Sequence, residues 1–150
     1  MFKKILVALD GSDTANLALK EAITIAKEGN SMVRGVFVVD AYHVTPEVEF
    51  ITTQEVIDSM RSEAKVILEK AKKKLDLAGI KSDTKILETD ASEGRIAEVI
   101  AREAKNWSAN LIVVGTHGRR GFSHFLLGSV AESIIRVATK PVLLIRGKNR

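Results

Sequence analysis

The strongest constraint on the fold is an alternation along the chain between five short apolar runs and four segments of helical period. The runs are rich in Val, Ile and Leu, which is typical of parallel strands covered on both faces. Between them, apolar residues recur at spacings of three and four, which indicates amphipathic helices. The five runs are Ile5–Leu9, Val33–Val39, Thr84–Leu87, Leu111–Val114 and Val142–Ile145.

The helical segments have recognisable ends. Ser12 is a suitable N-cap for the first helix, whose apolar face begins at Ala15. Gly79 follows the long second helix, and Pro141 follows the fourth. The βαβαβαβαβ pattern predicts an α/β fold, an open five-stranded parallel sheet with right-handed crossovers and helices on both faces. A length of 150 residues suits one such domain.

Composition excludes several classes of function. The chain has no cysteine, so disulfides, thiol catalysis and thiolate metal sites are ruled out. The first apolar run is too short for a signal sequence, and no stretch approaches the roughly 20 apolar residues of a membrane span, so we expect a cytoplasmic protein without a membrane partner. The net charge is +4, but the lysines from Lys65 to Lys74 are interleaved with Glu63 and Glu69 and lack aromatic neighbours. This pattern favours a solvated helix face over a nucleic-acid site.

In open parallel sheets, ligands bind beyond the carboxyl ends of the strands, where the strand order reverses. The segments to consider therefore follow the first four strands. Two of them, 40–54 and 115–127, are longer than the 2–6 residues that typically connect a strand to a helix. Extra chain at this end of the sheet points to a binding role.

The segment after the fourth strand combines two ingredients of a phosphate site. Its glycines allow backbone N–H groups to approach an anion, and a helix that begins near Ser129 adds the positive end of its dipole. Arg119 and Arg120 supply positive charge. A plain alternative stays open, in which the glycines only turn the chain and Ser129 only caps a helix. No Walker A sequence and no Gly-x-Gly-x-x-Gly motif is present.

The spacing Gly115-x2-Gly118-x9-Gly128-Ser129 is similar to the ATP-binding signature of the universal stress protein family. The resemblance extends over nearly the whole chain, through Lys4–Ser12, Val38-Val39-Asp40 and Lys140–Ile145. It implies the Rossmann-like fold of the adenine nucleotide alpha hydrolase type, with strand order 3-2-1-4-5. It also implies the ATP-binding branch of the family and a single ATP-binding domain over residues 1–150.

The resemblance assigns roles by position. Asp10 is expected at the ribose hydroxyls, a task that suits a carboxylate, although capping of the first helix is the alternative. Val38 is expected to hold adenine through its backbone, with Ala8 near the base. Mg²⁺ or Mn²⁺ is expected only through the phosphates, because the histidines show no metal-ligand spacing. The residues expected around the triphosphate are Gly115, Thr116, His117, Gly118, Arg119, Arg120, Gly121, Gly128, Ser129 and Val130.

Three hypotheses of function follow. The favoured one is a nucleotide-dependent regulator or stress-response switch, and the second is a slow ATPase or phosphotransferase that uses the same site. The glycine segment contains no carboxylate to orient water, although Glu88, Asp90 and Glu93 follow the third strand. A phosphorylated receiver domain is disfavoured, because Lys140-Pro141 precedes the fifth strand instead of following it.

The last apolar run, Val142–Ile145, carries no charge and is expected at the edge of the sheet. An uncharged apolar edge strand invites pairing with another chain. We therefore expect a two-fold homodimer through the fifth strands, as the resemblance also implies.

Overall fold

A computed structural model of the chain describes residues 2–44, 51–92, 94–117 and 127–147. Five strands form one sheet in the order β3-β2-β1-β4-β5, and every pair of neighbours is parallel. The predicted fold class and strand order are therefore confirmed. The strands are β1 (Lys4–Ala8), β2 (Met32–Val39), β3 (Ser82–Glu88), β4 (Leu111–Gly115) and β5 (Val142–Ile145).

Helices connect the strands as the helical periods predict. Ser12 caps the first helix by accepting a hydrogen bond from the Ala15 amide at 3.2 Å. A capping box of Thr52 and Glu55 begins the second helix, and Gly79, with φ of +72°, follows its end. A short 3₁₀ turn after β2 was not predicted. The helices are α1 (Asp13–Gly29), α2 (Thr53–Leu77), α3 (Ile96–Asn106) and α4 (Ser129–Val137), and the 3₁₀ turn is η1 (Ala41–His43).

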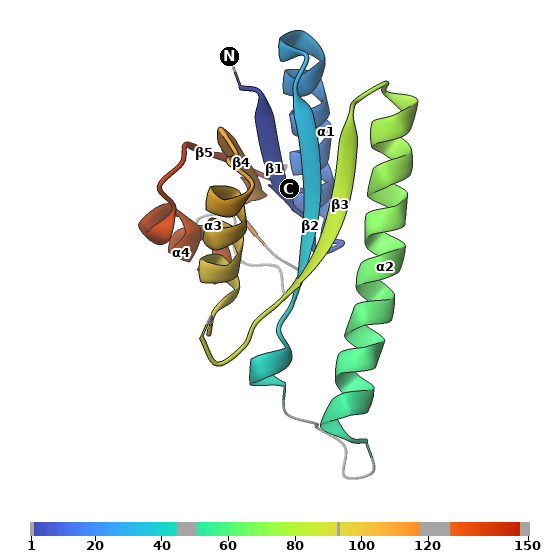
Figure 1. The fold of residues 1–150 in the computed structure, drawn as a ribbon, viewed down its shortest axis with the longest axis vertical. Coiled ribbons are helices and arrows are strands. Elements are labelled where there is room, and N and C mark those ends of the chain that lie inside the picture. The colour runs from blue at the N-terminus through green and yellow to red at the C-terminus, as the bar shows by residue number, and fades with distance from the viewer. Residues whose placement is uncertain (1, 45–50, 93, 118–126, 148–150) are drawn as a thin grey trace.

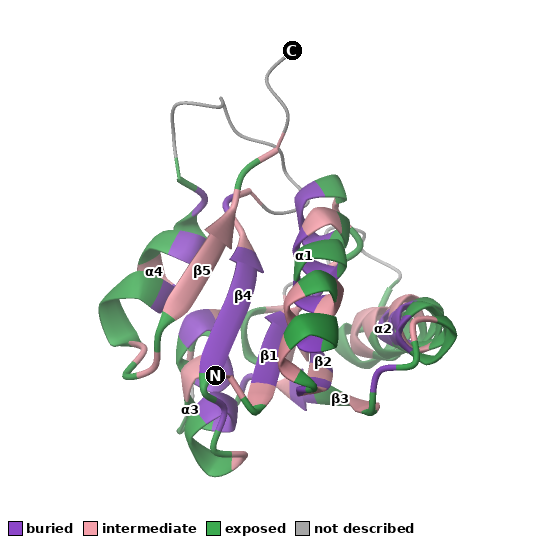
Figure 2. Ribbon diagram, turned by 90° about the horizontal axis from the view of Figure 1, so that it is seen from above, coloured by how far each residue is buried: buried purple, intermediate pink, exposed green. Residues whose placement is uncertain are grey.

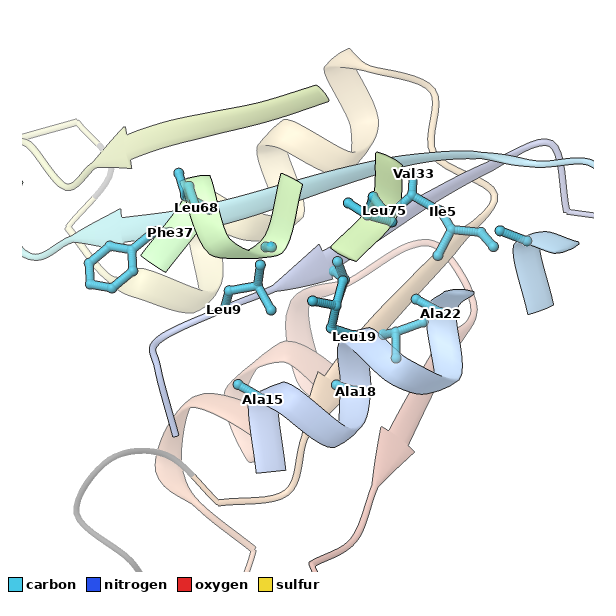
Figure 3. Packing of buried hydrophobic residues seen from close by; sticks show 14 of the residues in the cluster. Ile5, Leu9, Ala15, Ala18, Leu19, Ala22, Val33, Phe37, Leu68 and Leu75 are labelled. Carbon is cyan, nitrogen blue, oxygen red and sulfur yellow. The ribbon is translucent and has the colours of Figure 1, made fainter. Parts of the chain in front are cut away.

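The helices form two layers with the sheet between them (Figures 1 and 2). α1 and α2 cover one face, while α3 and α4 cover the other. β1 lies in the middle of the sheet, and its successive side chains point to the two faces in turn. Ile5 and Val7 pack toward α1 and α2, whereas Leu6 packs toward α3 and α4, and all three are fully buried. Figure 3 shows the α1 and α2 side of this core, where Leu19 and Leu75 meet β1.

The outer strands are less covered than the apolar runs predict. All four residues of β5 are half-buried, because β5 has a neighbouring strand on one side only. β3, at the opposite edge, also exposes part of its length. Within the described ranges, no helix has the length and apolar character needed to cross a membrane.

Candidate functional site

The exit of β1 presents a carboxylate at the carboxyl end of the sheet. Gly11, with φ of +85°, turns the chain between the strand and α1, and a side chain there would meet Ile67 of α2 at 2.9 Å. Asp10 Oδ1 accepts the Ser12 amide at 2.9 Å. Oδ2 of Asp10 has no hydrogen-bond partner in the part of the chain that the structure describes. This oxygen is available to a ligand hydroxyl.

The exit of β2 leaves backbone groups beside the point where β1 has ended. The last paired residues of β1 and β2 are Ala8 and Val36, and the Val36 carbonyl accepts the Leu9 amide at 2.8 Å. On the opposite edge of β2, the Val39 carbonyl accepts the Thr89 amide at 3.1 Å. Since alternate residues of a strand bond to opposite neighbours, the backbone groups of Val38 face the β1 side, beyond the last paired residue of β1.

The segment between β4 and α4 is hydrogen-bonded at both of its ends. The Thr116 amide donates to the Ile145 carbonyl at 2.9 Å, which continues the pairing of β4 with β5. The Gly128 amide donates to the Thr116 carbonyl at 2.6 Å, which brings the start of α4 back to the end of β4. The Thr116 hydroxyl lies 3.1 Å from His117 Nδ1. The two ends of the glycine-containing segment are therefore adjacent.

The N-cap of α4 is Gly128, which has no side chain that could cap the first backbone N–H groups of the helix. Gly128 is buried, and Ser129 after it is exposed. α1 and α2 differ, because Ser12 caps α1 and a capping box begins α2, whereas the N-cap of α3, Arg95, also makes no side-chain cap hydrogen bond. Free N–H groups and the positive end of a helix dipole favour a negatively charged ligand. The start of α4 therefore offers backbone N–H groups and a positive dipole end to an anion.

The structure brings together most of the predicted residues that it describes. Ala8, Asp10 and Val38 lie at the exits of β1 and β2, and the remaining ones lie at the exit of β4 and the start of α4. All of these belong to the carboxyl end of the sheet, between β2 and β5. The residues of the second group are Gly115, Thr116, His117, Gly128, Ser129 and Val130. Four predicted residues, Gly118, Arg119, Arg120 and Gly121, lie outside the described residues.

Sequence reasoning missed a polar cluster at the exits of β2 and β3. Asp40 Oδ1 accepts the Thr89 hydroxyl at 2.8 Å and lies 2.8 Å from His43 Nδ1. Thr89, which is buried, also accepts the Tyr42 amide at 3.1 Å. Asp40 alone was visible as a polar residue after a strand, but its pairing with Thr89 joins residues 49 positions apart. The cluster fixes η1 against the end of β3.

The carboxylates after β3 are placed as follows. Glu88 forms two hydrogen bonds of 2.8 Å with the Arg61 guanidinium of α2, and the bond with Glu88 raises the pKa of Arg61 above its ordinary value. Asp90 accepts the Ser92 amide at 2.8 Å, and Glu93 lies outside the described residues. No group of three or more His, Cys, Asp or Glu side chains among the described residues is arranged to hold a metal ion.

A small cavity of about 150 Å³ lies between α1 and α2. Its lining includes Leu9 and Leu19, together with Lys70 and Lys74. Val38 and Ala8 pack on the other face of the sheet, with α3 and α4. The cavity is therefore separate from the site at the exits of β2 and β4.

The chain is similar to known proteins over nearly its whole length. The sequence model of the Universal stress protein family matches residues 1–146. Universal stress protein MJ0531 of Methanocaldococcus jannaschii is 38% identical over 149 residues, which are 97% of this chain and 83% of that protein. The solved structure of protein MJ0577 from the same organism has a TM-score of 0.86 at 33% identity and covers 100% of this chain and 99% of its own. The universal stress protein of Archaeoglobus fulgidus, solved in complex with dAMP, has a TM-score of 0.66 at 28% identity and covers 95% and 97%.

Proposed function

Because the chain belongs to the universal stress protein family, we propose that it binds ATP at the carboxyl end of the sheet and acts as a nucleotide-dependent regulator in a stress response. The observation that carries the proposal is the uncapped start of α4, which the Gly128–Thr116 hydrogen bond of 2.6 Å holds against the end of β4. This arrangement suits a triphosphate, because main-chain N–H groups and a helix dipole meet where the chain turns. The whole chain then forms one ATP-binding domain.

The exits of β1 and β2 suit the nucleoside. Val38 offers backbone groups on the side where β1 has ended, so the edge of an adenine ring can take the place of the missing strand. Ala8 is small and half-buried beside this point. Asp10 keeps one carboxylate oxygen available for the ribose hydroxyls.

The phosphates would lie against Gly115, Gly128, Ser129 and Val130, with Mg²⁺ or Mn²⁺ bound through phosphate oxygens. Thr116, His117, Gly118, Arg119, Arg120 and Gly121 complete the proposed phosphate segment. The dAMP complex of the Archaeoglobus fulgidus relative supports an adenine nucleotide as the ligand class. The pairing of Glu88 with Arg61 disfavours Glu88 as an acid or base at the γ-phosphate.

Calorimetric titration with ATP tests the site. The unmodified chain is expected to bind ATP, and Asp10→Ala is expected to weaken binding at least about tenfold by removing the ribose acceptor. Asp13→Ala is the matched control, because it removes an exposed carboxylate three residues away in the first turn of α1. Absence of heat with ATP, together with no adenine nucleotide in native mass spectra of the protein from cells, would refute the proposal. Robust multiple turnover of ATP would favour the ATPase or phosphotransferase hypothesis over the regulator.

We also propose a homodimer through β5. The Pro141 carbonyl accepts the Ile112 amide and the Ile145 carbonyl accepts the Thr116 amide, so the backbone groups of the alternate residues, Val142 and Leu144, face away from the sheet. Light scattering at micromolar concentration is expected to give twice the 16.4 kDa chain mass. Leu144→Pro should give a monomer by removing an outward N–H, while Leu144→Ala, which keeps it, should remain a dimer. A monomeric unmodified chain would contradict this proposal.

A further inference from the structure

We propose that Thr14 is a positioning residue that fixes the exit of β4 relative to the exit of β1, and so sets the distance between the ribose and phosphate parts of the site. The assignment of these parts rests on the proposed function. Thr14 belongs to the first turn of α1 and is expected to touch no nucleotide. Sequence pattern gives no signal for it, since it reads as an ordinary helical residue.

The first observation is a hydrogen bond between distant parts of the chain. The Thr14 hydroxyl donates to the backbone carbonyl of His117, and the two residues are 103 positions apart. Thr14 is 8% exposed, so water competes little for this bond. His117 is the last described residue before 118–126, and its carbonyl is bonded to the first turn of α1 through Thr14.

The second observation is that the neighbouring glycines leave space for Thr14. A side chain at Gly115 would lie 2.6 Å from Thr14 Oγ1 and 2.9 Å from its backbone carbon. A side chain at Gly147 would lie 3.1 Å from Thr14 Cγ2. The hydroxyl and the methyl group of Thr14 therefore both pack where the chain lacks side chains. β4 and the segment after β5 approach α1 closely for this reason.

The third observation is that the contact completes a set of restraints. The Thr116 amide bonds to Ile145, and the Gly128 amide bonds to the Thr116 carbonyl. These two bonds hold the segment to β5 and bring its ends together. β4 pairs with β1 as far as Val7 and Val113, and Thr14 links the chain beyond that pairing to the helical turn that Asp10 precedes. The Asp10 carboxylate and the exit of β4 are thereby fixed relative to each other.

Three variants separate the hydroxyl from the rest of the side chain. Thr14→Val keeps the shape and removes the donor, Thr14→Ala removes the donor without adding bulk, and Thr14→Ser keeps the donor. The matched control is Thr24→Val, because Thr24 lies in the same helix and its hydroxyl donates to the Lys20 carbonyl at 3.2 Å on the exposed side. Each protein is studied as the full chain.

Two measurements test the proposal. Without nucleotide, Thr14→Val and Thr14→Ala are expected to speed amide exchange at Thr116 and Gly128 about tenfold, while Thr14→Ser and Thr24→Val leave it unchanged. In titrations, the same two variants are expected to bind ATP about tenfold more weakly and adenosine within about twofold of the unmodified chain. A role limited to stability would weaken both ligands equally.

Each outcome decides one claim. Unchanged exchange at Thr116 and Gly128 in Thr14→Val and Thr14→Ala overturns the positioning role, as does equal weakening of ATP and adenosine. Failure of the unmodified chain to bind ATP refutes the proposed function instead. In that case the exchange measurement still decides whether Thr14 fixes the exit of β4.

Discussion

The two ends of the sheet are held in different ways. At the amino end, side chains join the strands to one another. Asn110 Oδ1 accepts the amides of both Lys3 and Lys4 at 2.9 Å, and Lys4 Nζ donates to the Trp107 carbonyl at 3.1 Å. Arg34 also lies over the Trp107 ring, 4.6 Å from its centroid. Polar side chains at this end are therefore occupied in structural contacts.

At the carboxyl end, side-chain contacts also join β2 and β3, where Asp40 bonds to Thr89, but at the exit of β4 most contacts are made by backbone groups and close packing. Gly115 approaches Thr14 so closely that no side chain fits, and the bonds of Thr116 and Gly128 are made by the main chain. Among the described residues, Oδ2 of Asp10 has no hydrogen-bond partner. Side-chain partners therefore stabilise the amino end, whereas the exit of β4 needs space for close packing of the backbone.

The amino half of the sheet also contains a buried charge. Glu103 of α3 is 6% exposed and accepts a hydrogen bond from Lys85 at 2.7 Å and from Arg34 at 3.5 Å. Arg34 forms two further bonds to Asp83, and the bond with Asp83 raises the pKa of Arg34 above its ordinary value, so the guanidinium stays charged beside Glu103. This network joins β2 and β3 to α3.

The largest effect is expected from Gly115→Ala, which tests the need for space. The added methyl group meets Thr14 atoms at 2.6–2.9 Å, including its backbone, so the free energy of unfolding should fall by about 2–3 kcal/mol. Urea unfolding measures it. Gly94→Ala is the control, because a methyl group there meets nothing within 4 Å. A fall in the free energy of unfolding of less than about 1 kcal/mol would mean that α1 shifts without cost. Close packing at Gly115 would then not be needed at the exit of β4.

The next effect is expected from Glu103→Gln, which tests the need for partners. The amide keeps the shape but loses the charge that two cations share, so the free energy of unfolding should fall by about 1–2 kcal/mol while ATP affinity stays unchanged. Glu132→Gln is the control, since its pair with Arg136 is exposed on α4 and should cost less than about 0.5 kcal/mol. Equal losses in the two variants would contradict the network's role.

A smaller loss is expected from Asn110→Ala. Two backbone amides lose their acceptor, but both lie near solvent and water can replace it, so the cost should be about 1 kcal/mol. Asn106→Ala, at the exposed end of α3, is the control and should be nearly neutral. A decrease in ATP affinity for Asn110→Ala would show that the two ends of the sheet are not independent.

The smallest effect on stability is expected from Asp10→Ala, the variant that should damage ATP binding. It loses one half-exposed hydrogen bond to the Ser12 amide, so the free energy of unfolding should fall by no more than about 0.5 kcal/mol. Asp13→Ala should be similar in stability but normal in binding. A loss above about 1.5 kcal/mol for Asp10→Ala would assign Asp10 to the structural contacts instead.

Local patterns predicted the elements well, because the evidence for them is local. Buried parallel strands are almost continuously apolar, so β2 and β4 were located within one residue at each end, as was the apolar edge strand β5. β3 was predicted too short, since its edge position tolerates the polar residues Ser82 and Asp83. The N-cap of α1 was visible because Ser12 and its partner amide are neighbours in the chain.

Contacts between distant residues were not predictable in this way. The glycine spacing after β4 pointed to a turn near an anion, but it carried no information on what packs against Gly115. Thr14, Glu103 and Trp107 receive their roles from neighbours that only the folded chain supplies. The pairing of Asp40 with Thr89 belongs to the same group, because it needs the β2 and β3 register.

The central place of β1 has a consequence for how the protein is made. β1 leaves the ribosome before the other four strands of the sheet, yet Ile5 pairs on one side with Leu111. At synthesis rates of about 5–20 residues per second, that side waits on the order of 5–20 seconds for its partner. Until then the nascent chain holds β1 between one finished neighbour and an open edge of apolar residues. A translational pause before residue 111 prolongs the interval in which a chaperone, or another nascent chain, can reach that edge.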